Sequence, residues 1–263
     1  MNSLKKLEEK SIFILREVKK RFKNPAILWS MGKDSTVLLW LCKKAFYGKI
    51  PFKVLHIDTE TEFDEVYDFR DKIAKEWKLD VVVRKTKGKF EEKTCAPRKT
   101  EILKNAVHEF GFDALIVGIR RDEHHIRNKE RYFSPRDKEF RWKVYENGKS
   151  MQDAEFSGWW IYATEFGEDT DHVRVHPLLH WNEEDIWEYI KQEQIPVLDM
   201  YFSKDGKRFR SVGCKCCSQP IKSDAKNIKE IIDEIKKNKD DERKGRDIDK
   251  EHRMEKLRSL GYM

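Results

Sequence analysis

The chain has 263 residues, of which 38% are hydrophobic and 39% charged, and 55 basic against 48 acidic residues give a net charge of +7. This length suits one large α/β domain with an extension, and the charge suits a polyanionic ligand or an acidic partner. Because acidic residues are interspersed among the basic ones, nucleic acid is not an expected partner, and no apolar run is long enough to span a bilayer.

The cellular compartment is predicted from the cysteines and the N-terminus. The five cysteines are an odd number, and three of them crowd into residues 214–217, which is a poor disulfide framework. The first residues are rich in Lys and Glu and do not resemble a signal peptide. We therefore expect a protein of the reducing cytoplasm.

In the first half of the chain, apolar runs alternate with amphipathic stretches. A first helix begins at Ser3, strands are expected at residues 26–29, 52–57, 81–83 and 114–118, and helices at about 33–47, 62–77 and 97–110. This alternation predicts an α/β fold, a parallel sheet with helices on both faces.

The second half has fewer periodic segments. Residues 120–142 are polar and basic, residues 143–172 have low periodicity, and Asn182 is a good N-cap for a helix that stops before Pro196. Residues 201–263 are expected to form a mainly helical extension, in which Ser223-Asp224 caps a helix rich in isoleucine. We predict a nucleotide-binding catalytic domain at 1–200 and a basic, Cys-containing extension at 201–263.

The most informative stretch is residues 30–36, Ser-Met-Gly-Lys-Asp-Ser-Thr, between the first strand and its helix. A strand that turns directly into a helix leaves unpaired N–H groups at the positive end of the helix dipole, which favours anion binding. Lys33 adds a positive charge, and Gly32 would let the backbone approach a phosphate. The spacing differs from that of a Walker A loop. The plain alternative is a Ser/Gly turn that only caps a helix.

Two further polar clusters follow predicted strands, Asp58-Thr59 and Gly118–Glu123. Ligands of parallel sheets bind beyond the carboxyl ends of the strands, so the loop and both clusters are expected at one rim. The basic run that begins at Arg120 could be a solvated face. Because it starts at a strand end, contacts with polyphosphate or sulfate are the favoured interpretation.

The loop at 30–35 resembles the PP-loop of ATP pyrophosphatases. Further segments are typical of one family within that superfamily, at residues 56–59, 118–123, 129–131, 133–137, 176–178, 185–187, 210–214 and 242–246. Together they resemble the small subunit of bacterial-type sulfate adenylyltransferases, almost from end to end. The cysteine cluster is denser than the pattern of that family.

The resemblance implies a reaction and a partner. Members make adenosine 5′-phosphosulfate and pyrophosphate from ATP and sulfate with Mg²⁺, beside a larger GTPase subunit whose GTP hydrolysis offsets an unfavourable equilibrium. Both reactants are anions, so catalysis is expected to consist of positioning and charge neutralisation, without a covalent nucleophile. The extension is expected over the active site and at the partner interface.

The resemblance also implies roles for residues. The expected catalytic residues are Lys33, Arg120, Arg121, Arg127 and Arg131. The expected nucleotide-binding residues are Ser30, Gly32, Lys33, Asp34, Ser35, Thr36, Asp58, Thr59, Gly118, Arg208 and Arg210. Asp34 or Asp58 is the candidate for Mg²⁺.

Three rivals stay open. A phosphoadenosine phosphosulfate reductase would use a C-terminal Glu-Cys-Gly motif, whereas this sequence has no Cys after Cys217. A PP-loop enzyme that transfers sulfur to nucleic acid could use the cysteines as carriers or iron–sulfur ligands, and a nucleotide-binding scaffold would lack catalysis.

We interpret the cysteine turn as metal-free packing of the extension over the nucleotide. The alternative is a site for zinc or an iron–sulfur cluster on Cys95, Cys214 and Cys217.

Overall fold

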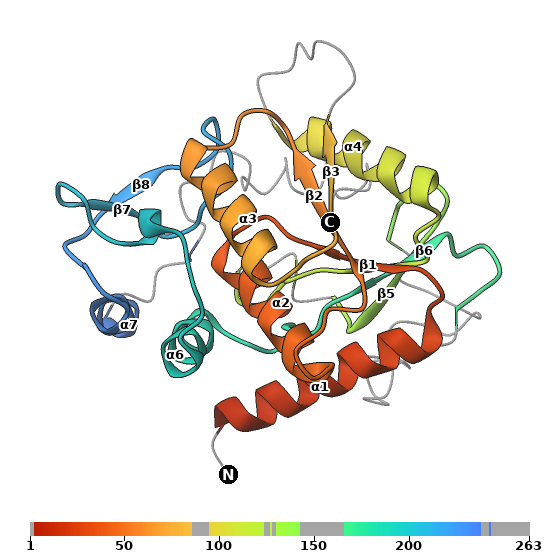
Figure 1. Ribbon diagram of the computed structural model, residues 1–263, viewed down its shortest axis with the longest axis horizontal. Helices are drawn as coiled ribbons and strands as arrows, with labels where there is room; N and C mark the ends of the chain where they lie inside the picture. Colours follow the sequence, from red (N-terminus) through yellow and green to blue (C-terminus); the bar gives the residue numbers. More distant parts are fainter. Residues whose placement is uncertain are drawn as a thin grey trace.

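The computed structural model describes residues 3–85, 95–123, 127, 130–142, 166–237 and 242. A six-stranded sheet lies at its centre, in the order β3-β2-β1-β4-β6-β5, with helices around it (Figure 1). The strands are β1 (Pro25–Leu28), β2 (Lys53–Asp58), β3 (Val81–Lys85), β4 (Ala114–Ile116), β5 (Phe133–Arg136) and β6 (His172–Val175). The helices are α1 (Ser3–Arg21), α2 (Lys33–Ala45), α3 (Asp64–Glu76), α4 (Cys95–Phe110), α6 (Glu183–Glu193), α7 (Ile228–Lys237) and the short 3-10 helix η3 (Asp199–Tyr201).

The connections create a switch point at the middle of the sheet. From β1 the chain moves outward through β2 to β3, then returns to β4 on the other side of β1, and these strands and β6 are parallel. The chain segments that leave β1 and β4 therefore diverge, which opens a crevice beyond their carboxyl ends. The predicted α/β class is confirmed. The sequence analysis did not anticipate β6, nor β5, which pairs antiparallel with β6 at the edge.

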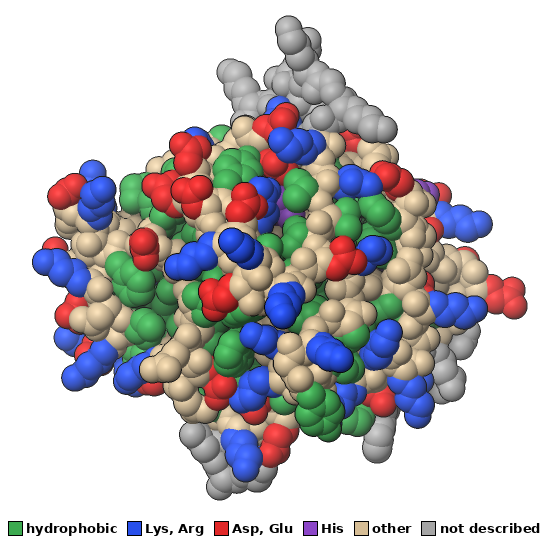
Figure 2. All heavy atoms as spheres, viewed as in Figure 1, with side chains coloured by type: hydrophobic (Ala, Val, Ile, Leu, Met, Phe, Trp, Pro, Cys, Tyr) green, Lys and Arg blue, Asp and Glu red, His purple; other side chains and the backbone are tan. Residues whose placement is uncertain are grey.

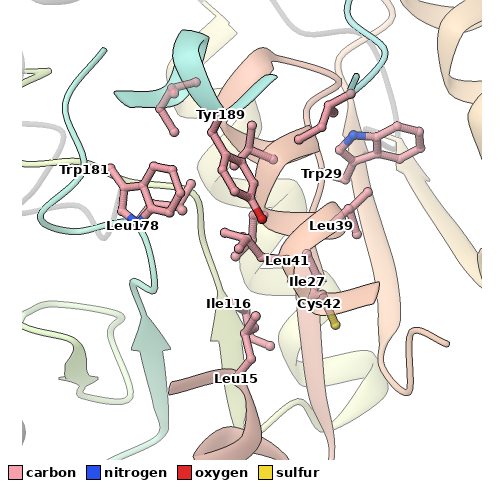
Figure 3. Close-up of a cluster of buried hydrophobic side chains, with 14 of the residues drawn as sticks. Leu15, Ile27, Trp29, Leu39, Leu41, Cys42, Ile116, Leu178, Trp181 and Tyr189 are labelled. Atoms are coloured by element: carbon pink, nitrogen blue, oxygen red, sulfur yellow. The ribbon is translucent and has the colours of Figure 1, made fainter. Parts of the chain in front are cut away.

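Helices cover both faces because neighbouring residues of each central strand point in opposite directions. Ile27 of β1 and Ile116 of β4 face the larger core, with α1, α2 and α6. Ala26 and Leu115 face a smaller core against α4. Figure 3 shows side chains of the larger core, among them Leu39 and Leu41 of α2 and Ile27 of β1. Trp181 and Tyr189 belong to the same core. Each fully buried leucine contributes roughly 1.5–3 kcal/mol.

Two predicted helix caps have different outcomes. Asn182 caps α6: its Oδ1 accepts from the Asp185 N–H at 2.8 Å, and the Asp185 carboxylate accepts from the Asn182 N–H at 3.0 Å. The predicted Ser223-Asp224 cap is wrong, because α7 begins only at Ile228. Asn227 Oδ1 accepts from the Glu230 N–H there at 3.0 Å.

The extension adds β7 (Lys207–Phe209), β8 (Pro220–Lys222) and α7, and α7 lies beside α6 in Figure 1. The antiparallel β7–β8 pair was not expected in a mainly helical extension. Ile231 and Ile232 of α7 are buried in the larger core together with α6, so this part of the extension packs on the same hydrophobic core as the sheet. The boundary at residue 200 stays a prediction.

Several expectations fall outside the described residues: Lys129, the segment with Trp159-Trp160, and residues 243–263. Among the described helices, none combines the length and the hydrophobicity needed to cross a membrane. On the face shown in Figure 2, acidic and basic side chains are interspersed over the surface.

Candidate functional site

A cavity of about 270 Å³ lies where the chain leaves β1, β2 and β4. Part of its wall is apolar and is formed by Leu28, Leu55, Ile57, Leu103, Val117 and Ile119. Another part is polar and includes Ser30, Asp34, Ser35, His56, Glu62, Lys99, Glu123, Arg127, Arg174 and Tyr201. Such a cavity suits a ligand with one apolar and one charged end.

The loop between β1 and α2 forms one side of the cavity. Met31 has a φ of 59°, in the left-handed region, and its side chain is buried, whereas Gly32 has an ordinary φ of −66°. The residue whose backbone needs the rare conformation is thus Met31, at a cost of about 1–2 kcal/mol. Such strained residues cluster at functional sites, because the surrounding structure must hold them in place.

Hydroxyl groups hold this loop. The Ser35 hydroxyl donates to the Gly32 carbonyl at 3.0 Å and lies 3.2 Å from the Ser30 hydroxyl. Thr36 also donates to the Gly32 carbonyl, at 2.9 Å, but it is fully buried and does not line the cavity. The first N–H of α2, on Lys33, donates to the Tyr201 hydroxyl at 2.9 Å. Tyr201 therefore links the loop to η3.

Gly118 lies beyond β4 and packs against the start of α2. A Cβ at this position would be 3.2 Å from the carbonyl group of Asp34 and from the Ser35 nitrogen. The two chain segments at the switch point can approach this closely because residue 118 lacks a side chain. Gly118 also lines the cavity, next to the loop, as its place in the sequence suggested.

Lys33 and Arg120 are buried cations that share a carboxylate. Both pair with Glu242, and Arg120 also pairs with Asp34 and with Asp122, the latter at 2.9 Å. Burial alone would raise the pKa of Glu242, but Lys33 and Arg120 lower it well below its usual range. Burial opposes the charge of Arg120 as well, yet Glu242 and Asp122 raise its pKa overall. Glu242 and Arg120 are therefore both charged at neutral pH.

The remaining arginines of the basic run occupy different places. Arg127 lines the cavity and pairs with Glu123, one helical turn away in sequence. Arg121 donates to the Glu130 carbonyl at 2.7 Å, and burial lowers its pKa. Arg131 is buried. Neither Arg121 nor Arg131 is among the described residues that line the cavity.

Two arginines of the extension, Arg208 and Arg210, form ion pairs away from the cavity wall. Arg208 pairs with Glu234 of α7 at 2.7 Å, and Arg210 pairs with Glu183 at the start of α6, also at 2.7 Å. The Arg210 pair therefore joins the extension to α6, whereas the Arg208 pair lies within the extension. Their assignment to nucleotide binding stays a prediction.

Asp58 and Thr59 come directly after the residues of β2 that line the cavity. The Asp58 carboxylate accepts from the Glu60 N–H and the Tyr67 hydroxyl, both at 2.8 Å, and these bonds lower its pKa against the effect of burial. Thr59 donates to Glu62 at 2.9 Å. Neither Asp58 nor Thr59 is among the described residues of the cavity wall. Thr59 contacts the wall through its hydrogen bond to Glu62, and Asp58 lies two residues after His56.

Sequence reasoning missed several residues of the cavity. His56 donates through Nδ1 to the Trp29 carbonyl at 3.3 Å, burial lowers its pKa to about 4, and its buried Nε2 has no hydrogen-bond partner in the described structure. Arg174 was missed because β6 was not recognised, although an arginine between two valines was a signal. Tyr201 lines the cavity from η3 and gave no local signal. Glu242, which contacts Lys33 outside the cavity wall, lies in the family-typical segment 242–246, but the sequence assigned it no role.

Cys95, Cys214 and Cys217, the alternative metal ligands, come together at the start of α4. The residues just before Cys214, Ser211–Gly213, line the cavity.

Comparison with known proteins agrees with this geometry. The model of the phosphoadenosine phosphosulfate reductase domain matches residues 24–220. Solved structures show the same fold: an FMN adenylyltransferase of Candida glabrata in complex with FAD and inorganic pyrophosphate (TM-score 0.56, 16% identity, 81% of this chain and 62% of that chain) and a phosphoadenylyl-sulfate reductase of Candida auris (TM-score 0.51, 17% identity, 83% and 98%).

Curated relatives match from end to end. Sulfate adenylyltransferase subunit 2 of Psychromonas ingrahamii is 39% identical, covering 100% of this chain and 98% of the relative. The subunit of the same name from Pseudoalteromonas translucida is 38% identical, covering 100% and 99%. With its β1–α2 loop at the switch point, its domain match and these full-length relatives, the chain belongs to the sulfate adenylyltransferase subunit 2 family.

Proposed function

We propose that this chain is a sulfate adenylyltransferase, which transfers the adenylyl group of ATP to sulfate and releases pyrophosphate. The observation that carries the proposal is a pair of buried cations at the switch point, Lys33 and Arg120. Neither is among the described residues that line the half-apolar cavity, but both pair with Asp34, which does line it. An apolar wall suits a base and a cationic end suits phosphates, and the two together support the proposal.

The apolar part of the cavity fits the adenine. Leu28, Ile57 and Leu103 provide apolar side chains for contact with the ring. His56 provides Nε2, which has no hydrogen-bond partner in the described structure. Because Nδ1 donates to the Trp29 carbonyl and the ring is neutral, Nε2 is an acceptor. The adenine amino group is a donor of the kind that this acceptor requires.

The loop end fits the phosphates. The Lys33 ammonium has three donors and contacts two carboxylates, Glu242 and Asp34, the latter at 3.5 Å. These carboxylates orient the ammonium, and the start of α2 adds the positive end of the helix dipole, although its first N–H donates to Tyr201. We assign the pyrophosphate portion of ATP to this end, with Ser30 and Ser35 as further donors.

A magnesium ion fits the residues present. Asp34, Glu123 and Glu242 each offer a carboxylate oxygen, and these oxygens lie within 4.8 Å of one another. Oxygen donors of this kind suit Mg²⁺, which would neutralise charge on the departing pyrophosphate. Asp58 is the less suitable candidate, because it lies outside this group of neighbouring carboxylates.

The reaction needs two anions close together. In-line attack by a sulfate oxygen on the α-phosphorus forms one P–O bond as the bond to pyrophosphate breaks, and no proton has to move. The cations Arg127 and Arg174 line the same cavity and lower the repulsion between the reactants.

The test is release of pyrophosphate from ATP by the purified chain with its partner subunit. We expect release that requires sulfate, together with formation of adenosine 5′-phosphosulfate. Pyrophosphate released at the same rate without sulfate would contradict the proposal and favour another ATP pyrophosphatase.

The name of the relatives, subunit 2, supports the existence of a larger partner subunit. We propose that this partner is a GTPase, since the sequence of this chain has no Walker A stretch of its own. Net synthesis by the isolated chain should be small, and addition of the GTPase subunit with GTP should raise it. Equal synthesis by the isolated chain without GTP would refute this coupling.

A further inference from the structure

Four of the five cysteines meet at one point, although they come from distant parts of the chain. Cys95 begins α4, and Cys214, Cys216 and Cys217 form a turn 119 or more positions later. The Sγ atom of Cys217 lies 2.8 Å from that of Cys95 and 3.0 Å from that of Cys214, and all four sulfur atoms lie within 4.8 Å of one another. Packing of the extension against α4 creates this cluster.

The four sulfur atoms are close enough together for one ion. With Zn–S bonds of about 2.3 Å, tetrahedral geometry places sulfur atoms about 3.8 Å apart. Four of the sulfur pairs are 2.8 to 3.5 Å apart, slightly closer than this, and every pair lies within 4.8 Å. A four-iron cluster needs a wider arrangement, because each thiolate binds a different iron. No disulfide joins the four thiols, which are all free.

Three hydrogen bonds close the turn that carries Cys214 and Cys217. The Cys217 and Ser218 N–H groups both donate to the Cys214 carbonyl at 3.0 Å, and the Ser218 hydroxyl accepts from the Gly213 N–H at 2.7 Å. These bonds turn the C-x-x-C pair of residues 214 and 217 toward Cys95, with both thiols buried. This spacing is typical of one half of a zinc site, and the second half is usually another pair. Here that pair is Cys95 and Cys216.

We propose that Cys95, Cys214, Cys216 and Cys217 form a structural site for one zinc ion, in place of the metal-free packing expected from the sequence. Four thiolates fill the tetrahedral shell and leave no position for a substrate, so the ion has no part in the adenylyl transfer. Its effect is on the cavity wall. It holds Ser211–Gly213 against α4, whose Lys99 lines the same cavity one turn after Cys95.

A backbone contact supports this clamping role. The Lys215 N–H donates to the Thr61 carbonyl at 2.7 Å, so the cysteine turn also touches the segment after β2. The zinc ion would thus join three segments around the cavity: the start of α4, the segment after β2 and the extension. Metal binding to such a preformed site adds to the stability of the folded state.

The site is tested by metal analysis of the full chain, purified anaerobically without chelators. We expect about one zinc per chain, and loss of at least nine-tenths of it in the Cys214→Ser variant. The matched control is Cys42→Ala, which removes the fifth thiol from the hydrophobic core of Figure 3. This control should keep its zinc.

The Cys216→Ser variant tests the site even if Cys214→Ser does not fold. Cys216 is exposed, so Cys216→Ser should fold, and it should release zinc to a chelator at least tenfold faster than the original chain. Full retention of zinc at the original rate would overturn the four-thiolate assignment. Metal-free folded protein would overturn the site itself, and iron with an equal amount of acid-labile sulfide would replace the single ion by a cluster.

Discussion

Replacing Lys33 by alanine is expected to lower the rate of sulfate-dependent pyrophosphate release by roughly a hundredfold or more. The ammonium is buried beside the loop and contacts Glu242 and Asp34. Its loss would remove the charge-assisted contact that we propose with the leaving pyrophosphate. Such a contact is worth about 2–4 kcal/mol in the transition state. The measurement is steady-state release of pyrophosphate at saturating ATP and sulfate.

The matched control lies in the same helix. Lys44 is at the other end of α2, where it pairs with Glu8 at 2.8 Å and Glu193 at 3.0 Å. Lys44→Ala removes the same kind of side chain away from the cavity and should keep the original rate. Thermal unfolding followed by circular dichroism checks that both variants are folded. A folded Lys33→Ala variant with nearly full activity would remove the loop from the mechanism.

Mild acid is expected to destabilise the fold strongly. Burial lowers the pKa of His56, His172 and His176 to about 4, whereas the pKa of an unfolded histidine is about 6.5. Below pH 6.5 the unfolded chain therefore binds more protons than the folded one, so stability is lost as the pH falls from about 6.5 to 4. Each histidine contributes about 1 kcal/mol for each pH unit in this window.

Urea unfolding at pH 7.5 and at pH 5 measures this effect. We expect the free energy of unfolding to fall by several kcal/mol between the two values, because three histidines act together. The lowered pKa of Glu242 acts only below its ordinary range, at more acidic pH, so it leaves this interval unaffected. Both kinds of group lose stability as the pH falls, so the pH window of the loss, and not its direction, separates buried histidines from carboxylates.

A pair of variants assigns the effect. His176 is fully buried, with Nδ1 2.9 Å from the Arg131 carbonyl, and His176→Gln should make the fall between pH 7.5 and pH 5 smaller by about 2 kcal/mol. His108 is exposed on α4, and His108→Gln should leave the fall unchanged. An equally steep fall in both variants would contradict the assignment to buried imidazoles.

Helices, strands and caps that depend on a local residue pattern could be predicted from the sequence alone. The strand before Ser30, the turn and helix α2 lie within one short stretch, so their apolar periodicity predicted both the helix and its place at a strand end. The same reasoning placed Gly118 beside the loop, because parallel strands bring their carboxyl ends to one edge. Asn182 was recognised as a cap because a capping box lies within four residues.

Contacts between side chains far apart in the sequence could be identified only from the folded structure. Glu242 is 209 positions from Lys33, and Tyr201 is 168 positions from it, yet both contact this residue. No local periodicity encodes such pairs, since they depend on how the extension packs against the sheet. The left-handed backbone of Met31 is likewise imposed by its surroundings against the residue's own preference. The four thiols met for the same reason: α4 and the extension share one side of the cavity, and burial there brought Cys95 to a turn far along the chain.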